Sequence, residues 1–118
     1  MTFEEVKKIE NVEMLVKLST SHDLDILAGV ASNPNTPAEI LDKLAKNTNI
    51  FVQIYSLENH NIPTNTLRLF VRSNNILIKL SILNNQNITS DILRKLSFDK
   101  NLRVREKAEQ LMLERGEY

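Results

Sequence analysis

The chain repeats itself with a period of 26 residues, and this repetition restricts its possible folds more than any other feature. Residues 30–49 superpose on residues 56–75, and these on residues 82–101, without a gap. Two asparagines recur at the same places in each copy: Asn33, Asn59 and Asn85, and Asn35, Asn61 and Asn87. Two large apolar residues recur as well: Leu41, Leu67 and Leu93, and Leu44, Phe70 and Leu96. Repeats of this length are typical of arrays in which each unit packs on its neighbours.

Each copy has the pattern of two short helices. Pro37, Pro63 or Thr89 begins the second helix, where a residue without a free amide fits well, and Thr36 is expected to cap the first of these. Apolar residues at 40, 41, 44 and 45 have the spacing of a one-sided helix rather than the alternation of a strand. The first helix of each copy follows a short polar residue that we expect to cap it: Asp23, Asn49, Asn75 and Asn101.

These patterns predict an all-α fold, a short helical-repeat solenoid in one domain covering residues 1–118. Residues 1–23 would form an N-terminal partial repeat and cap, 24–49, 50–75 and 76–101 three full two-helix units, and 102–118 a C-terminal capping helix. Thr2 and Glu5 fit a capping box at the start, and Gly116 fits the end of the last helix. Such end caps are expected because a stack must cover its outermost apolar faces.

The first full copy resembles the leucine-rich repeat variant family, and the resemblance covers roughly residues 24 to 110. The matching residues are Val30, Ala31, Asn33, Pro34, Thr36, Pro37, Leu41, Leu44 and Ala45, followed later by Asp99, Val104 and Arg105. The resemblance implies a right-handed superhelix of paired helices; short HEAT-like helical pairs are a related alternative. The 26-residue unit is slightly longer than the family's usual one. The chain has no cysteine, so the iron–sulfur cluster of some members is not expected, nor any other cofactor.

Composition narrows the classes of function. Fifteen basic residues balance fifteen acidic ones, so no overall charge attracts the chain to nucleic acid or to an anionic membrane. No apolar run approaches the roughly twenty residues of a membrane span, and the acidic start does not fit a secretory signal. We therefore expect a cytoplasmic protein with no membrane partner. His22 and His60 are the only histidines and lie in no catalytic or metal-binding motif, which argues against an enzyme and a metal site.

The recurrent asparagines allow two interpretations. Two aligned rows of side-chain amides could present donors to a ligand, or they could satisfy buried backbone groups in a repeated turn. Turn residues recur wherever the turn recurs. We therefore favour the structural role.

Positions that differ between copies are better candidates for a binding surface. Residues 25, 51, 77 and 103 form one row of equivalent positions and are Asp, Phe, Leu and Arg. Residues 29, 55, 81 and 107 form a second row and are Gly, Tyr, Ser and Lys. Because the residue type varies along both rows, we expect both at the surface. Phe51 and Tyr55 share a helix face, and Leu77 lies one unit along. They form a candidate protein-binding patch, since aromatic residues are enriched in interfaces. The alternative is that they pack into the groove between helices.

A row of basic residues on the second helices offers an alternative surface. Its members are Lys43, Lys46, Arg68, Arg72, Arg94 and Lys95. Regularly spaced cations could follow a phosphate backbone. However, Glu13, Glu39 and Asp91 each precede a lysine by four residues, at positions 17, 43 and 95, which is the spacing of ordinary ion pairs on a helix surface.

The sequence thus favours a non-catalytic protein-interaction scaffold whose partner is another protein or a peptide segment. Binding of a nucleic-acid phosphate backbone by the basic row is the alternative. Self-association is a third, through the patch or through Leu111, Met112 and Leu113 near the end of the array.

Overall fold

The computed structural model describes residues 1–117, and within them the chain forms nine α-helices and no strand. The all-α prediction is therefore confirmed. The helices are α1 (Phe3–Lys7), α2 (Val12–Leu18), α3 (Leu24–Ser32), α4 (Ala38–Ala45), α5 (Ile50–Glu58), α6 (Thr64–Phe70), α7 (Ile76–Leu83), α8 (Ser90–Leu96) and α9 (Leu102–Arg115).

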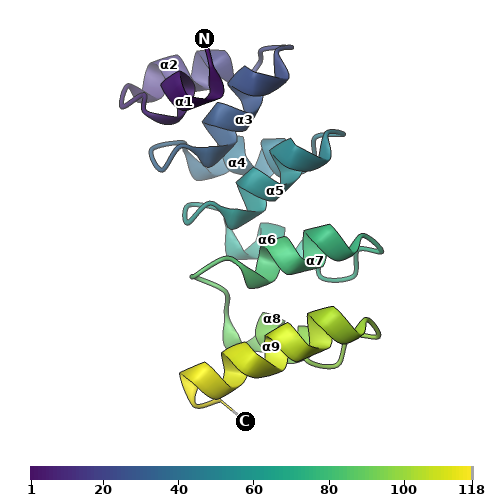
Figure 1. Cartoon of the computed structure of the whole chain (residues 1–118). Helices are drawn as coiled ribbons and strands as arrows, with labels where there is room; N and C mark the ends of the chain where they lie inside the picture. Colours follow the sequence, from purple (N-terminus) through teal and green to yellow (C-terminus); the bar gives the residue numbers. More distant parts are fainter. Residues whose placement is uncertain (118) are drawn as a thin grey trace.

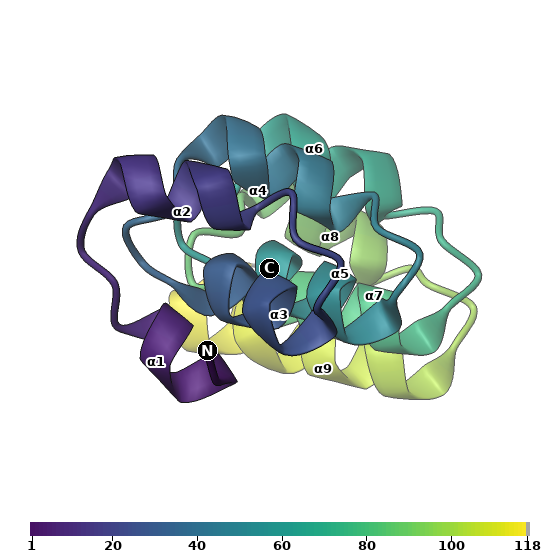
Figure 2. The ribbon, with the colours of Figure 1, turned by 90° about the horizontal axis from the view of Figure 1, so that it is seen from above.

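The helices lie in two layers. The odd-numbered helices pack on one another in chain order, from α1 to α9, and the even-numbered helices α2, α4, α6 and α8 cover one side of this row (Figures 1 and 2). The stack measures 43 × 25 × 22 Å, with the two chain ends at opposite ends of its long dimension (Figure 1). The N-terminal ends of α3, α5, α7 and α9 all lie along one edge, on the right of Figure 1.

Polar side chains begin the odd-numbered helices as the sequence predicts. Asp23, Asn49, Asn75 and Asn101 each accept a hydrogen bond from a backbone amide of the first helical turn. The residue two places earlier in turn accepts from the amide of each cap, at 2.8–3.1 Å, and these residues are Ser21, Asn47, Ser73 and Asp99. The prediction for Thr36 is wrong. Its hydroxyl is buried and donates to the Val30 carbonyl at 2.6 Å, and α4 begins without a side-chain cap.

The recurrent asparagines join neighbouring helical pairs. The Nδ2 of Asn59 donates to the Ala31 and Asn33 carbonyls at 2.8 and 2.9 Å, while its Oδ1 accepts from the Asn61 amide at 2.9 Å. Asn33 and Asn85 make the equivalent bonds, to the carbonyls of Val6 and Ile9 and of Leu57 and Asn59. All three side chains are buried. These bonds confirm the structural interpretation of the row, since each amide pairs backbone groups that lie one period earlier in the chain.

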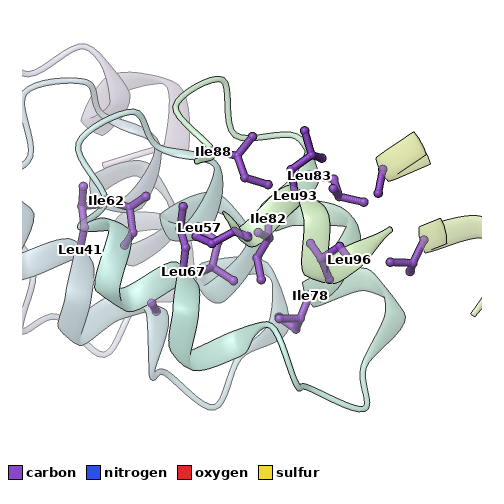
Figure 3. Close-up of a cluster of buried hydrophobic side chains, with 14 residues drawn as sticks. Leu41, Leu57, Ile62, Leu67, Ile78, Ile82, Leu83, Ile88, Leu93 and Leu96 are labelled. Carbon is purple, nitrogen blue, oxygen red and sulfur yellow. The ribbon is translucent and has the colours of Figure 1, made fainter. Parts of the chain in front are cut away.

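Two clusters of apolar side chains form the core. The larger, drawn in Figure 3, extends from α4 to α9 and includes Leu41, Leu67 and Leu93. The smaller is built around Val6, Leu15 and Val30 near the N-terminal end. Both clusters draw residues from α4 and α5, so these two helices join the two parts of the core.

The last helix differs from the earlier odd-numbered helices. At residue 111, one period after Asn85, the chain has a leucine, and α9 continues to Arg115 instead of turning. The Arg115 guanidinium donates to the Ile88 carbonyl at 2.8 Å. Gly116 then ends the helix in the left-handed conformation, with φ +71°, as its position predicts.

Candidate interaction surface

The three residues of the predicted patch differ in their exposure to solvent. Phe51 and Leu77 are 63% and 55% exposed. Tyr55 is half-buried, with its ring centroid 5.3 Å from that of Phe3. Phe51 and Leu77 therefore lie at the surface, and Tyr55 packs between helices.

The two rows of variable positions also differ in their exposure to solvent. Residues 25, 51, 77 and 103 are all exposed, as predicted. The prediction for residues 29, 55, 81 and 107 is wrong, because Gly29 and Ser81 are buried and the other two are half-buried. Gly29 and Tyr55 both meet residues of α1. A Cβ atom added at Gly29 would lie 2.6 Å from the Val6 Cβ, and the Lys107 ammonium donates to the Asn84 side chain. Variation at these positions reflects packing between particular helices.

Exposed apolar residues gather where the odd-numbered helices begin. We call them the apolar edge: Leu24, Phe51, Ile76, Leu77 and Leu102. Each is the first or second residue of α3, α5, α7 or α9, and so lies one or two places after a capping residue. The starts of these helices lie along one edge of the stack (Figure 1), so these five residues are placed along that edge. Sequence reasoning missed Leu24, Ile76 and Leu102, although residues 24, 50, 76 and 102 are aligned and all apolar.

The basic row is not a continuous positive surface. All six residues are exposed, but Lys46 pairs with Asp42 at 3.1 Å and Arg68 pairs with Asp91 at 3.1 Å. Asp91 thus binds a cation on the preceding even-numbered helix rather than Lys95. None of the three predicted pairs, between residues 13 and 17, 39 and 43, and 91 and 95, is among the ion pairs of residues 1–117.

Asp91 is the acid most strongly affected by this pairing. The hydrogen bond from Arg68, followed by that from Thr89, lowers the pKa of the Asp91 carboxyl to about 2. Asp91 therefore stays ionised and offsets the charge of Arg68 in the middle of the row. A long polyanion following the even-numbered helices would meet this carboxylate.

A second feature is a groove between two successive loops on the same edge as the helix starts. We call it the basic groove; it has a volume of about 520 Å³. The loop before α7 contributes Arg72 and Asn74, and the end of α8 with the loop before α9 contributes Lys95, Phe98 and Lys100. Phe98 is 81% exposed. Arg72 and Lys95 belong to the predicted row, but Phe98 and Lys100 were not predicted as site residues.

An ion pair forms part of the wall of the basic groove. The Lys79 ammonium lies 2.7 Å from Asp99 Oδ1, and each side chain is only 9% exposed. Asp99 Oδ2 also accepts from the Asn101 amide at 3.0 Å. Burial raises the pKa of the Asp99 carboxyl, but the hydrogen bonds from Lys79 and Asn101 and the nearby positive charges outweigh burial and lower it. Asp99 is therefore ionised and offsets the charge of Lys79.

Other predicted features receive less support from the structure. Leu111 and Met112 pack against the larger core cluster, so of the three terminal residues named for self-association only Leu113 is well exposed. His22 and His60 are exposed. Within residues 1–117, no three His, Asp or Glu side chains are grouped as metal ligands would be. In the same residues, every helix is too short or too polar to cross a membrane.

Comparisons of the chain with protein-family models, with curated proteins and with solved structures found no match. The resemblance to the leucine-rich repeat variant family therefore remains a prediction from the sequence. The function has to be argued from the surface itself, because a fold alone assigns none.

Proposed function

We propose that this chain is a right-handed solenoid of 26-residue two-helix units that acts as a non-catalytic protein-interaction module, binding through the apolar edge. The asparagine bonds support the repeat, because Asn33, Asn59 and Asn85 each reach back about one period to the preceding helical pair. An array of this kind presents equivalent helix ends side by side.

The observation that carries the proposal is the exposure of large apolar side chains at equivalent places on successive helices. Single exposed apolar residues are normal on a protein surface, whereas a group of them along one edge is a candidate interaction site. Phe51 and Leu77 project from neighbouring helices and do not belong to either core cluster. Burying each under a partner would contribute roughly 1.5–3 kcal/mol.

The shape of the apolar edge favours an elongated partner. The edge crosses the starts of α3, α5, α7 and α9 along the long dimension of the stack (Figure 1). An extended segment or a helix lying across these starts would contact several of them at once. Affinity would then come from several modest contacts.

The proposal is tested by affinity capture from a lysate of the source organism. The native protein is compared with a Phe51→Ser, Leu77→Ser variant and with a matched Leu69→Ser variant. Leu69 is 65% exposed but lies on α6 in the second layer. We expect the edge variant to lose a specific protein that the native chain and the Leu69 variant both capture. Capture of the same protein by all three, with helicity unchanged in circular dichroism, would contradict the proposal.

Binding to a nucleic-acid phosphate backbone is the second candidate. It is favoured by Arg72, Arg94 and Lys95, which are exposed and take no part in the ion pairs of residues 1–117. It ranks second because Asp42 and Asp91 interrupt the row. If it is correct, affinity for an oligonucleotide falls steeply with salt and is lost when Arg68 and Arg94 become glutamate, whereas apolar binding tolerates salt.

A further inference from the structure

We infer that the basic groove binds an acidic segment of the partner protein, a stretch of glutamate or aspartate residues around one large apolar side chain. This inference rests on the proposed function, because the groove adjoins the apolar edge. Asn74 lies two residues before Ile76, and Lys100 lies two residues before Leu102. A segment lying along the edge would therefore enter the groove.

Charge identifies the chemistry of this segment. Arg72, Lys79, Lys95 and Lys100 line the groove, and Asp99 is ion-paired with Lys79. The remaining three cations take no part in the ion pairs of residues 1–117. The whole chain has no net charge, so the excess of positive charge in the groove is a local feature. A carboxylate entering the groove would meet these three cations, and complementary charges of this kind attract an acidic partner.

These charges are not required by the fold. One period earlier, Gln53 stands where Lys79 does, and its amide donates to the Ala45 carbonyl at 3.0 Å, so a neutral side chain serves at that position. Lys100 corresponds to Asn74, and Phe98 to Arg72. The combination of cations and an aromatic side chain is thus particular to this groove.

Phe98 explains the apolar part of the proposed ligand. A phenyl ring that is 81% exposed contributes almost nothing to the core. It lines the same groove as Lys95 and Lys100, so it offers an apolar surface near these cations. If a leucine or phenylalanine of the partner packs on the Phe98 ring, the carboxylates next to it in the partner segment can reach Lys95 and Lys100.

The observations favour a peptide over nucleic acid. The three cations outside ion pairs come from the loop before α7, the end of α8 and the loop before α9, whereas a phosphate backbone needs a row of cations along its path. Along the even-numbered helices that row is interrupted where Arg68 pairs with Asp91 and Lys46 with Asp42. A short acidic segment needs only the groove.

The test measures fluorescence anisotropy with a labelled peptide of glutamates around a central phenylalanine. The same peptide with glutamines, and an oligouridine of equal charge, serve as comparison probes. We expect Arg72→Glu, Lys100→Glu to weaken binding of the acidic peptide at least about tenfold, and Phe98→Ala to weaken it about threefold. The control Lys7→Glu, Lys8→Glu makes the same charge change on α1, outside the groove, and should alter affinity less than about twofold.

Three results would overturn the inference. The first is undetectable binding of the acidic peptide to the native chain. The second is equal weakening by the groove and control variants, which would indicate net charge alone. The third is tighter binding of the oligouridine with the same dependence on Arg72 and Lys100. If the Phe51→Ser, Leu77→Ser variant still loses its captured protein in any of these cases, the proposed function stands and only the groove is wrongly assigned.

Discussion

Asn59 shows how a single side-chain amide joins two helical pairs. A side-chain amide has two N–H donors and a carbonyl acceptor, and Asn59 uses both kinds of group on buried backbone atoms of two consecutive helical pairs. Aspartate would have no donor for the two carbonyls. Leucine would leave the Ala31 carbonyl and the Asn61 amide without their partner, and the Asn33 carbonyl would keep only the bond from the Thr36 amide.

We expect Asn59→Ala to destabilise the protein by about 2–4 kcal/mol, because unpaired buried backbone groups cost about 1–3 kcal/mol each. The matched control is Asn74→Ala, which removes an exposed amide. Urea unfolding followed by circular dichroism measures both. Equal midpoints for the two variants would show that the amide bonds to Ala31 and Asn33 contribute little.

At the scale of elements, α1 approaches α3 so closely that Gly29 has no room for a side chain. A Cβ atom there would lie 2.6 Å from the Val6 Cβ and 3.0 Å from the Phe3 carbonyl oxygen. Part of this contact is backbone, so a side-chain rotation cannot relieve it. The half-buried stacking of Phe3 on Tyr55 depends on the same close approach.

Gly29→Ala is therefore expected to displace α1 and to destabilise the protein by roughly 1–3 kcal/mol, the usual cost of overpacking. The control, Ser32→Ala in the same helix, removes a buried hydroxyl that has no partner in residues 1–117, and should be neutral or slightly stabilising. Thermal unfolding compares the two. If Gly29→Ala stabilises the protein through the better helix propensity of alanine, α1 can be displaced without a loss of stability.

The ion pair of Lys79 and Asp99 links α7 to the loop before α9, and it makes stability depend on pH. The pKa of Asp99 is lower in the folded chain than the ordinary aspartate value of 3.8. A carboxyl with a depressed folded-state pKa stabilises the fold above its unfolded pKa, and this contribution is lost as pH falls through the folded-state pKa. The contribution is therefore present near neutral pH and is lost in acid below about pH 4.

We expect Asp99→Asn to be destabilised at pH 7, because Lys79 loses its counter-charge inside the fold, and to lose less stability than the native chain when the pH is lowered. Urea unfolding at several pH values measures the difference. Asp91→Asn is the comparison, since the exposed pair of Asp91 with Arg68 contributes less to stability. Parallel pH profiles for the native chain and Asp99→Asn would rule out this linkage.

Across the chain, the period of 26 residues predicts the helices, the caps of α3, α5, α7 and α9 and the buried asparagines, because these depend on contacts that recur along the chain. Exposure at a single position depends on which helix lies opposite. Gly29 and Tyr55 occupy equivalent positions and vary because each meets a different part of α1, and sequence alignment cannot distinguish such packing from a free surface. The partner of Asp91 and the basic groove were missed for the same reason, since both depend on how loops and helices of successive units meet.

We propose as the binding surface one edge of the stack, formed by the starts of α3, α5, α7 and α9. The most direct test is hydrogen–deuterium exchange of the native chain with and without its captured partner. We predict slower exchange on binding in the loops and first turns around residues 47–53, 73–79 and 99–105, with no change along α4 and α6. Protection confined to the even-numbered helices would contradict the claim and assign binding to the second layer.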